Sequence, residues 1–138
     1  MSSDHDIKVI VDTNLWISWL ITKDYKKLDK ILISNKARLV FSKELFQEFI
    51  EVAHRPKLKK YFSKRDLDNL VILIDEFAFF TDVKTIAREC RDEKDNFLLA
   101  LAIDSKADLL ITGDKDLLEL KKVQETRIIT IADFLKEI

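Results

Sequence analysis

Short apolar runs alternate along this chain with longer segments whose apolar residues recur at helical spacing. The run at 7–11 (IKVIV) is β-branched and nearly continuous, which is typical of a strand that is buried on both faces of a sheet. Strands that alternate with helices require crossover connections, and such connections join parallel strands. The alternation therefore predicts an α/β fold, a three-layer α/β/α domain whose parallel sheet has about five strands.

The same patterns predict the individual elements. Besides the first strand, we expect strands at 37–42, 79–83, 108–112 and 127–130. Helices are expected at 14–21, 25–34, 64–78, 95–105 and 131–137, with two more after Ser42 and after Gly113. Ser42 and Thr130 carry hydroxyl groups and are expected to cap the helices that follow them.

Glycine and proline are very rare in this chain, which has one of each in 138 residues. Folds built from strands alone need many tight turns and therefore many glycines, so helices are expected to dominate. No linker composition or repeat divides the chain, and its length is that of one domain. We expect residues 1–6 to form a flexible tail and residues 7–138 to form a single domain.

The composition excludes several classes of protein. Net charge is −1, from 24 basic and 25 acidic residues, so any contact with a polyanion must be local. A single cysteine, Cys90, excludes an internal disulfide and argues against a cysteine-based zinc site. The longest mostly apolar stretch, 67–80, is too short to span a bilayer. We therefore expect a cytoplasmic protein without a membrane partner.

Acidic residues stand at the edges of four apolar runs. In open parallel sheets, ligands bind outside the carboxyl ends of the strands, where such residues would gather. Two unit charges about 4 Å apart repel by roughly 1 kcal/mol in water and by roughly 4 kcal/mol at an effective dielectric constant near 20. Mg²⁺ or Mn²⁺, which prefer carboxylate ligands, would remove this repulsion and support a metal-dependent phosphodiesterase. The candidate ligands are Asp12, Glu48, Asp92, Asp95, Asp114 and Asp116.

These acids also have purely structural explanations. The aspartates that precede predicted helices could be caps or first-turn acids favoured by the helix dipole. Glu48 could belong to a solvated helix face together with Glu44 and Glu51. Capping and metal binding are compatible, so the structural explanation accounts for the residue type but not for the gathering of several acids.

Basic residues concentrate in one segment that contains no acid and is interleaved with Tyr61 and Phe62. Such a segment suits RNA, whose phosphates attract positive charge and whose bases stack on aromatic rings. A solvated helix edge is the alternative explanation. The residues are Arg55, Lys57, Lys59, Lys60, Lys64 and Arg65.

Four motifs occur in order along the chain: VDTN at 11–14, EFIEVAHRPK at 48–57, CRDEKDNFLLALA at 90–102 and ADLLITGDKDLL at 107–118. Together they resemble the motifs of PIN-domain ribonucleases, and most closely the branch formed by toxins of toxin–antitoxin pairs. The resemblance covers roughly residues 7–134. It implies a five-stranded parallel sheet, an acidic cluster that binds Mg²⁺ or Mn²⁺, and single-stranded RNA as the substrate.

The resemblance also implies roles for individual residues. Asp92 and Asp116 lie close enough in sequence to share or take over roles of the catalytic acids. Asn14 and Thr112 stand where the family places polar groups that orient a carboxylate or a phosphate. In our assignment, the three catalytic aspartates hold the principal metal, whereas the glutamate holds a second metal or activates the attacking water. The catalytic acids are Asp12, Glu48, Asp95 and Asp114.

Other function classes fit the residues less well. A receiver-like switch or a haloacid-dehalogenase-like phosphatase also places an aspartate after its first strand. The phosphatase pattern needs a second aspartate two residues later, where this chain has Asn14. A non-catalytic interaction module on the same fold is a third alternative, although such a module has no reason to gather acidic residues.

The chain has two candidate protein partners, an antitoxin and a second copy of itself. Apolar residues near the first helices could form a groove for either of them. The alternative is that these residues complete the core. They are Trp16, Trp19, Leu20 and Phe62.

Overall fold

The computed structural model describes residues 7–33 and 37–137, so the tail expected at 1–6 lies outside the described residues. Within the described ranges, the strands are β1 (Ile7–Val11), β2 (Ala37–Phe41), β3 (Ala78–Phe80), β4 (Leu109–Ile111), β5 (Lys122–Val123) and β6 (Thr126–Ile129). The helices are α1 (Thr13–Thr22), α2 (Lys26–Ile33), α3 (Lys43–Ala53), α4 (Lys64–Phe77), α5 (Glu93–Ser105), α6 (Lys115–Leu120) and α7 (Ile131–Glu137), with a short 3₁₀ helix at Pro56–Leu58.

The described strands form one sheet in the order β3-β2-β1-β4-β6-β5. Every neighbouring pair is parallel except β5 and β6, which are antiparallel. The predicted parallel sheet of about five strands is confirmed, and β5 is an addition that the sequence patterns missed. β5 has two residues and lies between Lys121 and Gln124, both with positive φ, so it is too short for an alternating pattern.

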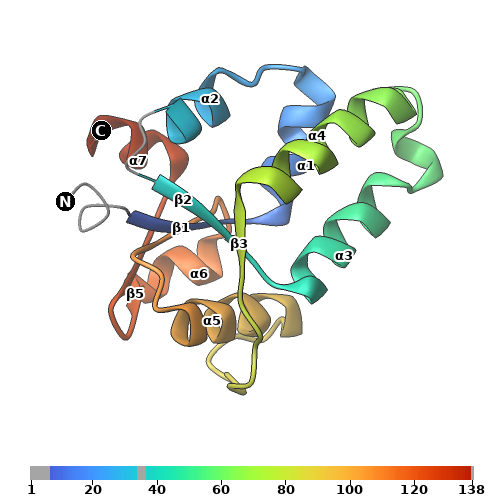
Figure 1. Ribbon diagram of the computed structural model, residues 1–138. Coiled ribbons are helices and arrows are strands. Elements are labelled where there is room, and N and C mark those ends of the chain that lie inside the picture. The colour runs from blue at the N-terminus through green and yellow to red at the C-terminus, as the bar shows by residue number, and fades with distance from the viewer. Residues whose placement is uncertain (1–6, 34–36, 138) are drawn as a thin grey trace.

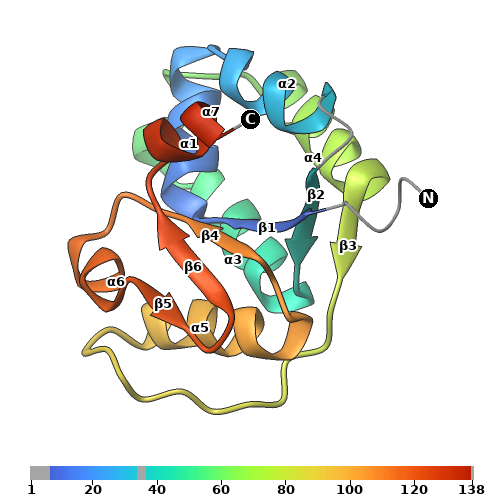
Figure 2. The same ribbon diagram turned by 90° about the vertical axis from the view of Figure 1, so that its left-hand side faces the viewer.

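Helices cover both faces of the sheet, as the three-layer prediction requires (Figures 1 and 2). α1, α2, α4 and α7 lie on one side, and α5 and α6 lie on the other. The central strand β4 is buried along its whole length. Its neighbour β1 is buried toward its carboxyl end, at Val9, Ile10 and Val11. Strands enclosed on both faces read as continuous apolar runs, which is why the IKVIV run was a sound predictor.

Local capping fixes where several helices begin. The Ser42 hydroxyl accepts a hydrogen bond from the Leu45 backbone amide at 3.0 Å, and the Thr130 hydroxyl accepts one from Asp133 at 3.1 Å. Both predicted caps are therefore confirmed. Within the ranges that the structure describes, no helix is both long and apolar enough to cross a bilayer.

The two tryptophans of α1 belong to the core rather than to a binding groove. Trp16 packs edge-on against Trp19, with ring centroids 5.2 Å apart, and its ring lies 5.7 Å from that of Phe41. The side chains named for a groove therefore complete the core, as the alternative has it, whereas an antitoxin or a second copy of the chain as a partner stays a prediction. The exposed fractions are 0% for Trp16, 5% for Trp19, 0% for Leu20 and 8% for Phe62.

β3 is shorter than the predicted strand at 79–83, because the chain turns into a long connection to α5. The side chain of Asp104 on α5 holds this connection: it accepts hydrogen bonds from the Lys84 amide at 2.6 Å, from the Thr85 amide at 2.8 Å and from the Thr85 hydroxyl. Partial burial acts to raise the pKa of Asp104, but these hydrogen bonds outweigh it and hold the pKa below the ordinary value of 3.8.

Replacing Asp104 with asparagine should loosen the loop at 81–92 and lower the thermal midpoint. Because the folded-state pKa is depressed, the stabilisation by Asp104 is present above pH 3.8 and is lost as the pH falls through the lower folded-state value. Thermal unfolding and limited proteolysis at pH 7 and pH 2.5 test this, with the exposed Asp68→Asn as the control. An equal difference from wild type at both pH values would contradict the charge-dependent role of Asp104.

Candidate metal centre

The acidic residues meet where the strand order reverses. From β1 the chain proceeds outward to β2 and β3, and it then returns to place β4 and β6 on the other side of β1. The carboxyl ends of β1 and β4 lie together there, since the Asp12 amide donates to the Ile111 carbonyl at 3.0 Å. Open α/β sheets bind ligands at this switch point.

Asp95, Asp114 and Asp116 form the tightest acidic group. One carboxylate oxygen from each lies within 4.8 Å of the others, in the range over which a single cation could contact all three. Asp95 comes from the first turn of α5, whereas Asp114 and Asp116 come from the start of α6. Residues almost twenty positions apart thus converge because α5 and α6 both begin at the carboxyl edge of the sheet.

Asp12 lies beside this group and is held by a buried threonine. The Thr112 hydroxyl donates to Asp12 Oδ2 at 2.7 Å and accepts a hydrogen bond from the Asp114 amide at 3.0 Å. Thr112 therefore links two of the predicted acids and orients the Asp12 carboxylate. Asn14 has an exposed side chain and contacts Asp12 through its backbone amide, at 3.3 Å from Oδ1.

Glu48 differs from the other glutamates of α3. Its Oε1 accepts a hydrogen bond from the Thr13 hydroxyl at 2.9 Å, and its side chain is half-buried. Glu44 and Glu51 on the same helix are exposed. Since Thr13 follows Asp12 directly, the hydrogen bond brings Glu48 to the end of β1 and distinguishes it from the exposed glutamates of the same helix.

The structural explanation of the aspartates is also correct. Asp92 caps α5 by accepting from the Lys94 amide at 2.9 Å, and Asp114 caps α6 by accepting from the Asp116 amide at 2.8 Å. One Asp114 oxygen serves the cap, while the carboxylate still reaches the acidic group. Asp92 is exposed and lies outside that group, so its position favours capping over metal binding.

Burial and negative neighbours raise the pKa of Asp95 from its ordinary value of 3.8 to about 6. The largest cause is burial, followed by repulsion from Asp114, Asp92, Asp12 and Asp116. A site that disfavours its own negative charge gains from a positive ion. Because the converging donors are carboxylate oxygens, they fit Mg²⁺ or Mn²⁺ rather than a cation that prefers sulfur or nitrogen.

The model of the PIN domain family matches residues 8–116, a range that includes the four motifs up to Asp116. The chain belongs to the PIN-domain family. It is also similar to the uncharacterized protein MJ1680 of Methanocaldococcus jannaschii, with 32% identity over 118 residues, covering 83% of this chain and 76% of the relative. PIN domains are typically nucleases, and an acidic cluster that could bind a metal ion is typical of them.

The tightest acidic group of this PIN domain differs in one member from the predicted set of principal metal ligands. The predicted principal ligands were Asp12, Asp95 and Asp114, whereas the group that converges within 4.8 Å contains Asp116 in place of Asp12. Asp12 remains near enough to raise the pKa of Asp95. Its hydrogen bonds with Thr112 and Asn14 hold its carboxylate at the end of β1, beside the group rather than within it.

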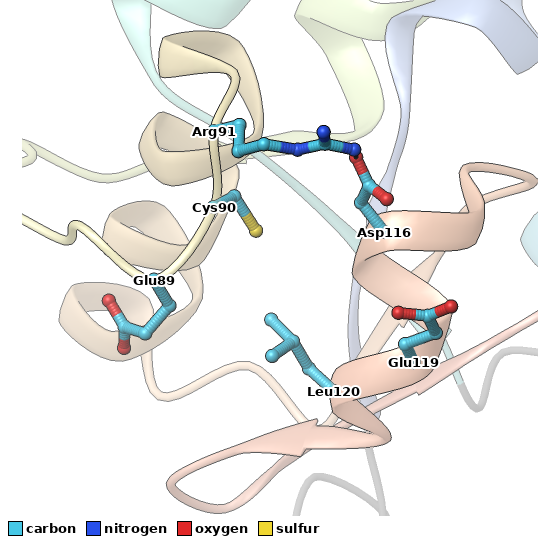
Figure 3. Close-up of a pocket in the computed structure, with 6 residues that line it drawn as sticks. All are labelled: Glu89, Cys90, Arg91, Asp116, Glu119 and Leu120. Atoms are coloured by element: carbon cyan, nitrogen blue, oxygen red, sulfur yellow. Dashed lines mark ion pairs between the residues drawn. The ribbon is translucent and has the colours of Figure 1, made fainter.

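The sequence reasoning missed two contributors to this region, Thr13 and Asn96, and it assigned no role to Arg91. Thr13 holds Glu48, Asn96 holds the backbone of Cys90, and the Arg91 guanidinium lies 3.6 Å from Asp116 Oδ2 (Figure 3). The signal for Arg91 was present, since a basic residue stands among the acids of the third motif. The two hydrogen-bonding partners gave no signal, because their roles depend on contacts between separate elements.

Proposed function

We propose that this PIN domain is a Mg²⁺- or Mn²⁺-dependent endoribonuclease that hydrolyses phosphodiester bonds of single-stranded RNA. The observation that carries the proposal is the convergence of Asp95, Asp114 and Asp116 at the switch point of the sheet, with Asp12 beside them. These carboxylates would hold the metal. A bound divalent cation would neutralise charge on the phosphate and make a water molecule more acidic.

Two threonines of the site would orient acidic side chains rather than bind the metal. Thr112 fixes Asp12 through the 2.7 Å hydrogen bond, and Thr13 fixes Glu48 through the 2.9 Å bond. Glu48 is then placed to orient the attacking water and accept its proton, or to help hold a second cation. When the water oxygen attacks phosphorus and the bond to the 3′ oxygen breaks, the products carry a 5′-phosphate and a 3′-hydroxyl.

A cleavage assay tests this function. The purified protein should cut a mixed-sequence single-stranded RNA with Mn²⁺ or Mg²⁺, and EDTA should stop the reaction. Asp12→Asn should lower the rate strongly, because it removes a carboxylate at the centre. No cleavage with either metal would favour the non-catalytic module, and labelling by acetyl phosphate would instead favour phosphoryl-transfer chemistry.

The basic segment is the proposed path of the RNA toward the metal centre. It begins at Arg55, two residues after the end of the helix that carries Glu48, and a step of seven residues corresponds to roughly 10 Å along a helix. Arg55, Lys57, Lys59 and Lys60 are all exposed, and the Lys60 ammonium lies 5.2 Å from the ring centroid of Tyr61. Exposed cations beside an exposed aromatic ring suit phosphates and stacked bases.

Replacing Lys59 and Lys60 together with alanine should raise KM and leave kcat near the wild-type value, the signature of lost uniform binding. Each phosphate contact contributes about −0.7 to the slope of log affinity against log salt for single strands, so the slope should flatten by roughly one unit. Titrations at several salt concentrations measure this. A Lys106→Ala/Lys122→Ala variant, exposed and on other elements, is the matched control. An unchanged slope would support the alternative explanation, in which Lys59 and Lys60 belong to a solvated helix edge.

We also propose that the nuclease acts as the toxin of a toxin–antitoxin pair. The support is the similarity of the four motifs to that branch of the PIN family. Induced expression should then arrest growth of a host cell, and the Asp95→Asn variant should not. An antitoxin would be identified as a small protein that copurifies and restores growth, and light scattering would detect a homodimer. Growth unaffected by active nuclease would contradict the toxin role.

A further inference from the structure

A pocket of about 380 Å³ opens beside the acidic group, between the 81–92 loop and α6. In Figure 3 the Arg91 side chain extends across it from the loop toward Asp116, while the Cys90 thiol and Leu120 point into the space between the two walls. The pocket thus joins the metal centre along the edge where Arg91 and Asp116 meet. Its lining residues are Glu89, Cys90, Arg91, Asp116, Glu119 and Leu120.

The backbone that carries Arg91 is held in place by Asn96. The Asn96 side chain is buried, with 4% of it exposed, and both ends of its amide group bond to Cys90. Oδ1 accepts from the Cys90 amide at 2.8 Å, and Nδ2 donates to the Cys90 carbonyl at 2.9 Å. Because Asn96 belongs to α5 and Cys90 directly precedes Arg91, these bonds tie to the helix the point from which the guanidinium extends.

We propose that Arg91 contacts a phosphate of the RNA strand at the metal centre and that Asn96 is the residue that positions it, an inference that rests on the proposed nuclease function. The guanidinium already reaches Asp116, a member of the acidic group, with the nearest nitrogen 3.6 Å from the carboxylate. A group that reaches a ligand of the cation would lie close to an anion bound to that cation.

The ion pair of Arg91 with Asp116 leaves the guanidinium available for this role. The two side chains are 91% and 45% exposed, and exposed ion pairs of this kind are weak. Guanidinium also presents several donors in a planar fork that matches phosphate oxygens. Elsewhere the pocket carries Glu89 and Glu119, which repel a phosphate and confine it to the edge at Arg91.

Because Arg91 and a divalent cation are both attracted to Asp116, the loss of Arg91 should affect metal binding and RNA binding differently. Removing the guanidinium should leave Mn²⁺ binding as tight as in the wild type, or tighter, and should weaken RNA binding at the same time. A residue needed only for the shape of the loop would not change the two affinities in different directions.

Arg91→Gln is compared with Arg88→Gln, which removes the same charge from an exposed arginine three positions earlier on the same loop. We expect KM for a mixed-sequence single-stranded RNA to rise roughly tenfold or more in Arg91→Gln, the scale of a lost hydrogen bond to a charged group. The Arg88 variant should stay within about twofold of the wild type, as expected for a screened surface charge. Mn²⁺ affinity is measured without RNA by electron paramagnetic resonance.

A double-mutant cycle tests the positioning role of Asn96. Asn96→Ala should raise KM in the presence of Arg91 and have little further effect in Arg91→Gln, because a residue that acts through another loses its influence when that residue is absent. If Asn96→Ala does not fold, Asn96→Ser, which keeps a hydrogen-bonding side chain, replaces it. Equal effects of the Asn96 change in both backgrounds would overturn the positioning role.

The outcomes separate this inference from the proposed function. Cleavage by the wild type with an unchanged KM in Arg91→Gln would overturn the inference and leave the nuclease intact. A parallel loss of Mn²⁺ and RNA affinity would also overturn it, since the substitution would then act on the acidic group itself. No cleavage by the wild type would remove the proposed function and the inference together.

Discussion

Asp95→Asn should lower the rate of RNA cleavage by on the order of 10²–10³-fold, the effect of removing one preorganised electrostatic group from an active site. Asp95 is the most deeply buried member of the acidic group, and four other carboxylates act on it. The substitution keeps the shape of the side chain, so a large loss of rate would come from the lost charge. Glu93→Gln, in the same helical turn but exposed, is the matched control and should cleave nearly like the wild type.

The same substitution should raise the stability of the metal-free protein. Since the folded-state pKa of Asp95 is raised to about 6, the unfolded chain releases this proton first, and stability falls as the pH rises from the ordinary 3.8 to about 6. Asparagine removes this contribution, so the thermal midpoint of Asp95→Asn should exceed that of the wild type at pH 7 without metal. Thermal unfolding in EDTA across this pH range measures the difference.

Adding Mn²⁺ should raise the thermal midpoint of the wild type above that of Asp95→Asn. A ligand that binds only the folded state stabilises it by about 2.7 kcal/mol at a concentration one hundred times its dissociation constant. The wild type should gain this stabilisation, whereas Asp95→Asn should gain much less. Equal shifts of the thermal midpoint by Mn²⁺ in both proteins would exclude Asp95 from the metal site.

Glu48→Gln should lower kcat by about 10²-fold, the scale expected when an acid–base group is lost. Glutamine still offers an oxygen to the Thr13 hydroxyl, so the 2.9 Å contact and the fold should persist while the charge disappears. Glu44→Gln and Glu51→Gln change the same residue type on the exposed part of α3 and should leave kcat nearly unchanged. Initial rates at saturating RNA separate these variants.

The Thr13 hydroxyl offers a second test of the role of Glu48. Thr13→Val removes the hydroxyl that orients Glu48 and keeps the branched shape of the side chain. If Glu48 acts on the attacking water, this variant should lose part of kcat, and combining it with Glu48→Gln should add little. Wild-type turnover in Glu48→Gln would show that the glutamate has no part in the chemistry.

Much of the fold could be predicted from short stretches of sequence. The IKVIV run gave β1 with its observed bounds, and the last helix, predicted at 131–137, is α7 (Ile131–Glu137). Periodic burial and hydroxyl or carboxylate caps are encoded within a few residues, so they can be recognised without any knowledge of tertiary contacts. β5 was not predicted, because a strand of two residues is too short to show an alternating pattern.

The sequence by itself determined which acids reach the carboxyl edge of the sheet. Asp12 ends a buried strand, and Asp114 follows another, so both must lie at that edge in a parallel α/β fold. The choice among neighbours such as Asp92 and Asp95 followed from the tertiary structure, in which the first caps α5 in solvent and the second turns inward.

Only the tertiary structure decided how these acids are arranged and held. Asp116 converges with Asp95 and Asp114, and Asp12 is held beside them by a hydrogen bond from Thr112, a residue one hundred positions away in sequence. The burial of Trp16 within α1 was likewise set by packing against residues of other elements. Such contacts depend on how helices and strands are placed relative to one another, and a periodic pattern within one segment carries no information about that placement.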